Sequence, residues 1–459
     1  MQKMKNGKKV LSVCLSLAMA AGMLSTSAFA SWNVYGGSNN HNAVVTEAPT
    51  APDKSGLDSY IQLHCTGSGW DGVDNVPVLQ TVNGTTYAYV LYDGYGASGA
   101  LVAKIRCAEN GGSSIVWTTD PYGTEGTSLN AKSGFQLSTP YLDDNGTPND
   151  ASDDTLYVGT ISQYDDYEGG EWLTGTGSKV MALTGLDQNK PTVTNVLTGI
   201  NGQINTPITT DGTYLYFGTW PGGSNAGTYY QVKLSDYSVK TFTPDSYGFY
   251  WAGAVSDGTN VYVGSDNGLL YWRSIADFDT TGGVLDLTDV ASDAGNVRST
   301  VMLDDGYLYF TTQGGYLWCY ETSANGAPTY QWHKKLGATS TSTPTKVGDR
   351  IYVGYYSGFN AGGVQCVSAD GSSVKAVVEG DGFPVQSSIV VMGDGTGTDY
   401  LYFNTNAQKG AGYCYSFDGT TGSKVWGTTG DTYALGGMAI DNGYAVFGND
   451  YNHLYVVHD

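Results

Sequence analysis

The side chains best suited to binding a ligand lie in short segments of this sequence where Tyr and Trp occur among Asp, Asn, Ser and Gly. Aromatic rings flanked by carboxylates and amides stack on sugar rings and hydrogen-bond their hydroxyls, or they grip an extended peptide. The alternative is that Tyr fills sheets and supports loops in a Tyr-rich protein. We predict a ligand-binding set consisting of Trp70, Tyr92, Tyr95, Tyr164, Tyr167, Trp172, Trp220, Tyr250, Trp251, Tyr355, Tyr356, Phe359 and Tyr451.

Carboxylates cluster in two further segments. Oxygen ligands suit calcium, so we weigh a calcium site against a solvated acidic insertion. The spacing does not match an EF-hand loop, which favours the solvated insertion in both segments. Acid pairs are also expected by chance in so acidic a chain, and we therefore predict no glycosidase pair. The residues are Asp143, Asp144, Asn145, Asp150, Asp153 and Asp154 in one segment and Asp165, Asp166, Glu168 and Glu171 in the other.

Histidine and cysteine offer little catalytic chemistry. The five histidines are scattered, and none lies near a Ser or Cys in a nucleophile motif such as G-x-S-x-G. Cys319, Cys366 and Cys414 each stand in an apolar or aromatic run, which indicates buried, unpaired thiols. No C-x-x-C pair or Cys/His cluster indicates zinc, and no phosphate-binding glycine loop occurs. We predict no catalytic residues and no metal site.

The elements that carry these segments are repeats. Each copy has a small or Thr/Ser-Pro start, an apolar strand, a turn with Asp/Asn-Gly, and an aromatic strand that ends in a small residue. Clear copies are TPITTDGTYLYFGT from Thr206 and STVMLDDGYLYFTT from Ser299. From Tyr216 onward the aromatic strand returns roughly every 43 to 50 residues, the period of a four-stranded propeller blade. No stretch has a sustained helical period.

Counting weaker copies, the chain holds about eight repeats, at the upper end of the usual propeller range. We therefore predict an all-β fold, an eight-bladed propeller of four-stranded antiparallel blades. The loops between second and third strands, together with the links between blades, then emerge on one face. This arrangement would gather the predicted ligand-binding set on that face.

A third and a fourth strand follow in each copy, most fully in YSFDGTTGSKVWG. Ser416 to Trp426 match the pattern A-x-D-x-x-T-G-x-x-x-W with Ser in place of Ala, and the opening SWNVYGGSNNHNA has the form W-x-x-x-G-G. On these motifs the chain resembles the pyrroloquinoline-quinone-like propeller repeats over residues 31 to 459. The resemblance implies a structural tryptophan-docking role for Asp418, Gly422, Trp426, Trp117 and Trp332.

That resemblance covers both enzymes and binding scaffolds, so it says little about function. Quinoprotein dehydrogenases usually carry adjacent cysteines, calcium ligands and basic residues that hold the quinone. No two cysteines are adjacent here, and Lys and Arg number only 21. The chain is therefore more similar to the non-enzymatic propellers of the outer-membrane-assembly type than to the dehydrogenases. We expect no quinone and no other cofactor, with calcium left open.

The last repeat ends at HLYVVHD, one strand short, while YIQLHCTG precedes the first repeat without a partner. We predict that Tyr60 to Thr66 completes the final blade, which removes an open sheet edge. The predicted organisation is a leader at 1–30, an N-terminal segment at 31–59 and the propeller at 60–459.

The first residues have the basic, apolar and small-residue order of an export signal, with cleavage expected after Ala30. The apolar run is too short to span a bilayer, and no later stretch is long enough. Removing the leader, which has four lysines, changes the net charge from −22 to −26. Such a surface repels nucleic acid and anionic lipid. We expect a secreted or surface-associated protein with no nucleic-acid partner and no membrane insertion.

Three functions remain open. The first is a non-catalytic scaffold of the cell envelope or medium that docks a polypeptide or glycan on its aromatic, acidic face. A polysaccharide-active enzyme is the second, and a quinone-dependent dehydrogenase is the third. A quinone absorbance, or turnover of a glycan, would separate them.

Overall fold

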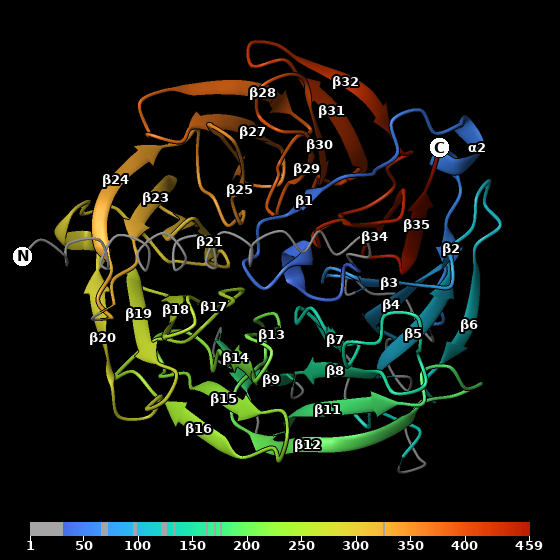
Figure 1. The fold of residues 1–459 in the computed structure, drawn as a ribbon, viewed down its shortest axis with the longest axis horizontal. Coiled ribbons are helices and arrows are strands. Elements are labelled where there is room, and N and C mark those ends of the chain that lie inside the picture. Colours follow the sequence, from blue (N-terminus) through green and yellow to red (C-terminus); the bar gives the residue numbers. More distant parts are fainter. Residues whose placement is uncertain are drawn as a thin grey trace, which may run out of the picture. The chain divides into compact units, whose positions relative to one another are not determined.

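A computed structural model of the chain describes residues 31–65, 72–94, 99–120, 126–131, 134–161, 164–168, 171–174, 177–324 and 326–459, with backbone alone for 164–168 and 171–174. Of the nine sheets that the described residues form, eight are arranged around a central axis, one blade after another along the chain, and the ninth is a two-stranded hairpin (Figure 1). Neighbouring strands within each four-stranded blade are antiparallel, as predicted. The fold is therefore an eight-bladed β-propeller.

Two strands of each blade lie nearest the axis. The innermost strands of blades 1 to 8 are β3 (Val78–Val82), β7 (Tyr141–Asp143), β13 (Thr209–Thr210), β17 (Val255–Ser256), β21 (Met302–Asp304), β25 (Thr345–Val347), β29 (Val390–Met392) and β33 (Ala439–Asp441). The second strands are β4 (Thr85–Asp93), β8 (Thr155–Thr160), β14 (Tyr214–Gly218), β18 (Asn260–Ser265), β22 (Tyr307–Thr312), β26 (Arg350–Ser357), β30 (Asp399–Asn404) and β34 (Tyr444–Gly448). They are almost continuously buried, because both of their faces pack on neighbouring blades.

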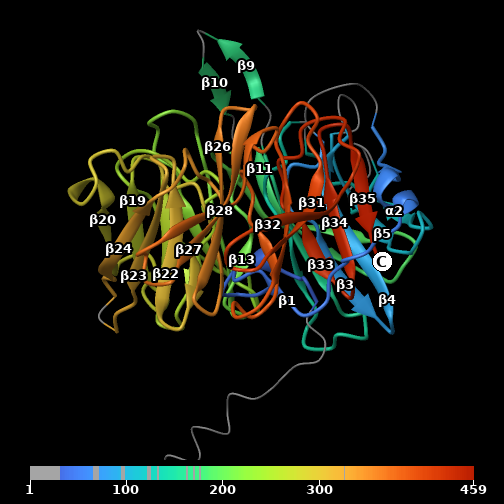
Figure 2. The same cartoon turned by 90° about the horizontal axis from the view of Figure 1, so that it is seen from above.

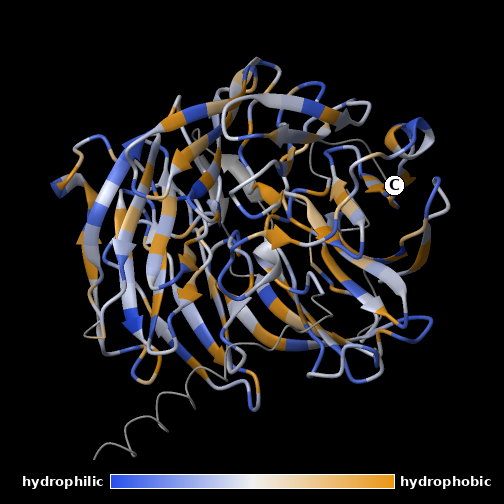
Figure 3. Ribbon diagram, turned by 45° about the horizontal axis from the view of Figure 1, so that its top comes forward, coloured by the Kyte–Doolittle hydropathy of each residue, from blue (hydrophilic) through white to orange (hydrophobic). Residues whose placement is uncertain are grey.

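The other two strands lie further out. The third strands are β5 (Ala100–Arg106), β11 (Ser178–Thr184), β15 (Tyr229–Lys233), β19 (Leu269–Ser274), β23 (Tyr316–Glu321), β27 (Ala361–Ser368), β31 (Gly412–Phe417) and β35 (His453–Val457). The outermost strands are β6 (Ser114–Thr118), β12 (Thr192–Ile200), β16 (Val239–Phe242), β20 (Gly282–Asp286), β24 (Thr329–Lys335), β28 (Val374–Asp381), β32 (Gly422–Gly427) and β2 (Ile61–Gln62). In Figure 3 the outer strands mix hydrophilic and hydrophobic colours, as expected where one face meets solvent.

The predicted closure is confirmed at β2, which pairs antiparallel with β35 through Ile61 opposite Leu454 and Gln62 opposite His453. The strand is shorter than the predicted Tyr60 to Thr66. Leu63 still donates its backbone N–H to Asn452 O, but residues 63 to 65 form no strand, and Thr66 lies outside the described residues. A strand that precedes blade 1 in the chain thus completes the last blade.

The segment Trp32–Val45, here called the plug, fills the middle of the ring (Figure 1). Trp32 O accepts the N–H of Leu79 in blade 1, Asn40 O accepts that of Leu303 in blade 5, and Ala43 O accepts that of Val391 in blade 7. Trp32 and Ala43 are buried in the core cluster of the closing blades. The plug therefore joins innermost strands from opposite sides of the ring.

Two further short elements belong to the plug. The 3₁₀ turn η1 (Tyr35–Gly37) reverses the chain, and β1 (Val44–Val45) adds a parallel fifth strand to the inner edge of β29. Gly37 has φ +69°, and a Cβ there would lie 2.6 Å from the Trp32 ring. The W-x-x-x-G-G pattern is thus explained by a tight turn in which the indole packs on a glycine.

From Pro49 to Gln62 the chain forms what we call the strap, which runs along the outside of blades 7 and 8. It contains α2 (Lys54–Asp58), whose N-cap Asp53 accepts the N–H of Gly56 at 3.0 Å. Asp459 accepts the N–H of Ala51 at 2.7 Å, which ties the strap to the last described residue.

Neighbouring blades are joined by the tryptophans of the repeat motif. Trp117 Nε1 donates to Leu186 O in blade 2 at 3.3 Å, and the ring of Trp332 packs against Gly371 of blade 6. Trp426 of blade 7 instead donates to Pro49 O at 2.8 Å. The strap therefore contacts the tryptophan that would otherwise meet the next blade.

The rest of the motif shapes the turn before the tryptophan. Asp418 Oδ1 accepts the N–H groups of Thr420 and Thr421 at 2.8 and 2.7 Å. A Cβ on Gly422 would lie 1.9 Å from Val377 O, so only glycine fits against the neighbouring blade.

Within the described ranges no helix is long and apolar enough to cross a membrane. A further 3₁₀ turn, η3 (Leu287–Asp289), follows β20. The five cysteines at 65, 107, 319, 366 and 414 are all free, and the last four are buried. The prediction of buried, unpaired thiols at Cys319, Cys366 and Cys414 is confirmed.

Candidate functional site

The top face is the side of the ring where blade links and second-to-third strand loops emerge. The hairpin of β9 (Tyr164–Glu168) and β10 (Glu171–Thr174) projects from it (Figure 2). At its centre the blade links surround a cavity of about 50 Å³. Every blade contributes to the lining, which also includes one residue of the plug: Tyr35, Asp74, Asn75, Val76, Leu137, Thr139, Pro207, Trp251, Arg298, Thr300, Thr341, Gln386, Ser387, Leu435, Gly436 and Gly437.

Tyr35 from the plug lines this cavity and is anchored by hydroxyl groups of the blade starts. Its hydroxyl lies 3.0 Å from Thr343 Oγ1, and burial raises the pKa of Tyr35. Thr343 Oγ1 also accepts the N–H of Thr300, whose own hydroxyl accepts the N–H of Gly253, both at 3.1 Å. Thr300 and Thr343, at the starts of blades 5 and 6, therefore bond blades 4, 5 and 6 to one another near the axis, and the plug joins them through Tyr35.

An aromatic cluster borders the cavity between blades 3 and 5. Trp220 meets Tyr250 edge-on at 5.2 Å, and Tyr250 lies 5.1 Å from Trp251. Trp251 has φ +59°, a left-handed conformation that bulky residues rarely adopt. Strain of this kind persists where surrounding contacts impose it, and it is concentrated at functional sites.

Arg298 completes the cluster, although nothing about its isolated position along the chain indicates a role. Its guanidinium lies 4.6 Å from the ring centre of Tyr250 and donates to both Asp266 oxygens at 2.7 and 2.6 Å. Burial alone would lower the pKa of Arg298, but the Asp266 carboxylate reverses that effect and raises it. The guanidinium of Arg298 therefore keeps its positive charge. The bidentate pair with Asp266 balances that charge and fixes the orientation of the guanidinium. Tyr356 lies close enough to add to the raised pKa.

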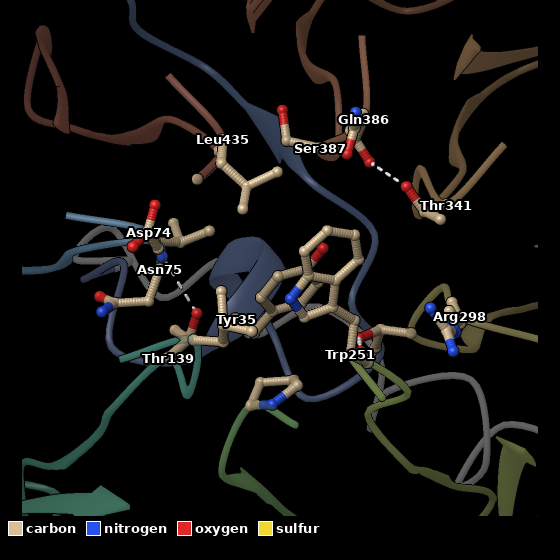
Figure 4. Close-up of a pocket in the computed structure, with 16 residues that line it drawn as sticks. Tyr35, Asp74, Asn75, Thr139, Trp251, Arg298, Thr341, Gln386, Ser387 and Leu435 are labelled. Carbon is tan, nitrogen blue, oxygen red and sulfur yellow. Dashed lines mark hydrogen bonds between the residues drawn. The ribbon is translucent and has the colours of Figure 1, made fainter. Parts of the chain in front are cut away.

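Asp74 and Asn75 form the opposite wall, so they and Arg298 lie on opposite sides of the Tyr35 and Trp251 rings (Figure 4). Both are buried. Asn75 Nδ2 donates to Leu91 O at 2.8 Å and to Gln136 O at 2.6 Å. Its Oδ1 is buried and has no hydrogen-bond partner among the described residues. The amide is thus fixed in orientation with its acceptor atom unused.

Two residues of the predicted ligand-binding set are not surface residues. Tyr92 is fully buried and Tyr355 is 7% exposed, so the prediction that they face a ligand is wrong. The cause is strand length: β4 continues to Asp93 and β26 to Ser357, which keeps both rings inside the blade packing. These tyrosines stabilise the core.

Phe359 and Tyr451 are exposed on the top face but lie apart from the cavity. They are 57% and 52% exposed. Phe359 meets Tyr433 edge-on at 5.5 Å, and Tyr451 lies 6.0 Å from His453. The structure therefore brings together Trp220, Tyr250, Trp251 and Tyr356 near Arg298, and leaves these two as separate rings.

The remaining predicted residues belong to the projecting hairpin or lie outside the described residues. Trp70 and Tyr95 lie outside the described residues. The backbone register of the hairpin puts Trp172 opposite Tyr167 and Thr174 opposite Tyr164. For this hairpin the structure describes the backbone alone.

The acidic segment around Asp143 and the cysteine thiols are the other candidates for chemistry in this chain. The turn at Asp143 and Asp144 uses their Oδ1 atoms to accept the N–H groups of Asn145 and Gly146 at 3.1 and 3.0 Å. Across the described part of the chain no three His, Cys, Asp or Glu side chains group as a metal site would require. Burial raises the pKa of the Cys414 thiol to about 12, which keeps it protonated and unreactive.

Comparison with known proteins identifies the fold. No family model matches the sequence, and no curated protein matches it. Among solved structures, BamB from Moraxella catarrhalis has a TM-score of 0.52 at 13% identity, covering 88% of this chain and 97% of its own. Quinohemoprotein alcohol dehydrogenase from Comamonas testosteroni has a TM-score of 0.54 at 11% identity, covering 92% of this chain and 77% of its own. Sqt1 from Saccharomyces cerevisiae has a TM-score of 0.50 at 11% identity, covering 90% and 99%. At these identities the likeness concerns the fold alone.

Proposed function

We propose that this protein is an exported, non-catalytic scaffold that docks a polypeptide on its top face. The observation that carries the proposal is the convergence of all eight blades on one small cavity beside the Trp220–Tyr250–Trp251 cluster. Interfaces concentrate binding energy in aromatic and Arg anchors that surround a pocket. A rigid ring with such anchors at its centre suits docking without rearrangement.

The volume of the cavity favours a polypeptide over a glycan. About 50 Å³ has room for roughly four water-sized groups, which is enough for the tip of a side chain and too little for a sugar ring. The exposed rings of Phe359 and Tyr451 offer further stacking surface for a partner that extends outward. A glycan bound only at these outer rings is the second arm of the test below.

A bound quinone does not fit the central cavity. Pyrroloquinoline quinone is a flat tricyclic tricarboxylate, and small-molecule sites for groups of that size are several times larger than this cavity. The guanidinium that lines the cavity is already paired with Asp266, so it is not free to hold the quinone carboxylates. These features support a scaffold without a quinone.

The proposal is tested with purified protein from residue 31 onward on peptide and glycan arrays, with an absorbance scan for quinone. Peptide binding without turnover is expected. Tyr250→Ala should weaken it at least about tenfold, as loss of a central aromatic anchor does. Tyr330→Ala, on the outer strand β24 and 40% exposed, is the matched control and should bind as the wild type does.

Turnover of an arrayed glycan, or a quinone spectrum, would refute the proposal. So would equal peptide affinity of the Tyr250→Ala and wild-type proteins. Export is tested separately by expressing the whole chain and sequencing the mature N-terminus, which is expected at Ser31.

A further inference from the structure

Most polar side chains around the central cavity are already used by the protein itself. Both Asn75 donors reach backbone carbonyls, and Thr341 Oγ1 donates to another backbone carbonyl at 3.0 Å. Arg298 directs Nε and Nη2 to Asp266. Asp74, which also lines the cavity, has an interaction of its own within the protein. The charged groups of the lining are therefore already engaged.

The indole N–H of Trp251 is a donor that remains available. Trp251 is half-buried, and its Nε1 makes no hydrogen bond to any residue that the structure describes. The Thr300 hydroxyl donates to Trp251 O at 3.2 Å and so holds the backbone at its φ of +59°. Ser387 Oγ, another lining atom, likewise has no partner among the described residues. The wall thus offers uncharged donors, which suit a carbonyl oxygen of a ligand.

Aromatic faces surround this donor. The rings of Tyr35 and Trp251 lie at the centre of the cavity (Figure 4), and the Tyr250 ring lies 5.1 Å from Trp251. The cavity of about 50 Å³ has room for roughly four water-sized groups. A proline ring is a compact apolar group of that size, and proline has no backbone N–H that would need an acceptor.

A polypeptide in the polyproline II conformation presents both complementary groups. Its backbone makes no internal hydrogen bonds, so its carbonyl oxygens are free to accept a bond from the indole. Grooves lined by aromatic rings bind such segments well, because the conformation is preformed and loses little entropy on binding. The free donor of Trp251 and the rings around it therefore favour this class of ligand.

We propose that the docked polypeptide is recognised through a proline in the polyproline II conformation. The inference rests on the proposed scaffold function and adds the chemical class of its anchor segment. The proline ring fills the cavity against Trp251 and Tyr35, and Trp251 Nε1 donates to a neighbouring backbone carbonyl of the ligand. One side chain thus supplies both a stacking face and the hydrogen bond.

The test is an NMR titration of the isotope-labelled protein from residue 31 onward. The ligands are Ac-Ser-Pro-Pro-Pro-Ser-amide and a matched peptide with leucine in place of each proline. The proline peptide should bind at least about tenfold more tightly, as expected for a preformed ligand. The indole N–H resonance of Trp251 should move downfield as its hydrogen bond forms. Because the anchor is uncharged, affinity should change little as salt rises.

Three variants separate the ring from the donor. Trp251→Phe keeps a ring and removes the N–H, so it should weaken the proline peptide about fivefold, the effect of one hydrogen bond. Trp251→Asn removes the ring as well while keeping a residue that tolerates positive φ, and it should weaken binding at least about twentyfold. Trp332→Phe, the same change on the outer strand β24, is the matched control and should bind as the wild type does. Melting curves verify that each variant folds.

Equal affinity for the proline and leucine peptides, or wild-type affinity of Trp251→Asn, would overturn the inference. A steep loss of affinity with salt would also overturn it, since it would indicate a charged anchor.

The two proposals fail in different ways. If arrayed peptides bind through Tyr250 without preference for proline, docking stands and the proline site is refuted. If the proline peptide binds at Trp251 while no arrayed polypeptide binds, the site stands and the scaffold function is refuted.

Discussion

Two junctions differ in what packs against the tryptophan of the outer strand. One is the junction between blades 5 and 6, and the other is the closing junction around blades 7 and 8. At the first, Trp332 packs on Gly371, a turn residue of the next blade in the chain. At the second, blade 8 has no outer strand of its own, and Trp426 bonds to Pro49 of the strap. The contrast teaches that regular junctions are local in sequence, whereas closure depends on residues 31–62.

Deleting residues 31–62 should have the largest effect, because it removes the plug, the strap and β2 together. Loss of the buried Trp32 alone is comparable to a core Trp→Ala change of about 3–5 kcal/mol, and the exposed edge of β35 adds to it. We expect a loss above about 6 kcal/mol and failure to form a stable ring, measured by thermal unfolding. Adding the segment as a separate peptide should restore part of the stability, whereas an unchanged melting curve would refute this account of closure.

Gly37→Ala tests the plug alone. Its φ of +69° and the approach of the new methyl to 2.6 Å from the Trp32 ring should together cost about 4 kcal/mol of unfolding free energy. Gly84→Ala is the control, since φ is +78° there and nothing lies within 4 Å of the added methyl. It should cost about 1 kcal/mol, from backbone strain alone. Equal losses in chemical denaturation would mean that the plug is loosely packed.

The plug also makes closure sensitive to acid. His41 Nδ1–H donates to Val301 O at 2.9 Å, and burial lowers the pKa of His41 to about 4. Between pH 6.5 and 4 the unfolded chain binds more protons, so stability should fall by about 3 kcal/mol as pH falls through that window. His41→Asn keeps an amide donor and tolerates the φ of +59°, but it does not titrate.

The two proteins should therefore diverge below pH 6.5 in denaturant titrations. Asp154 and Asp441 act in the opposite direction, since burial raises the pKa of each to about 6 and stability is lost as pH rises through that value. Comparing the variant with the wild type cancels their contribution. Parallel pH profiles of the two proteins would contradict the assignment to His41.

The smallest effect is expected from the tryptophans. Trp426→Phe loses the 2.8 Å bond to Pro49 O in a buried site and should cost about 2 kcal/mol. Trp332→Phe, in a partly exposed regular junction, should cost about 1 kcal/mol. If Trp332→Phe loses more unfolding free energy than Trp426→Phe in the same denaturation assay, the tryptophan of the closing junction contributes no more stability than that of a regular junction.

The ring could be predicted from sequence because each blade is a local unit. Asp/Asn-Gly turns such as Asp305-Gly306, both at positive φ, and the returning aromatic strand repeat within one blade. The position of β2 was also predictable, since the last repeat lacked a strand. The plug was not, because its partners Leu303 and Val391 are hundreds of residues away and its short segments have no periodic pattern.

The candidate site was only partly predictable. Trp220, Tyr250 and Trp251 share loop-like segments and do converge in the structure. Tyr92 and Tyr355 look the same in sequence, and only the lengths of β4 and β26 show that they are buried. Arg298 and the small size of the cavity depend on how eight separate links meet, which no single repeat encodes.

The strap has a consequence for the order of events in synthesis. Residues 61 and 62 leave the ribosome early, yet their strand partners Leu454 and His453 are made among the last of the chain. The segment made first must therefore wait while seven blades form, and its docking closes a very long loop. We expect refolding to show a late, slow phase that reports on β2 and the plug, during which the edge of β35 is open to other chains.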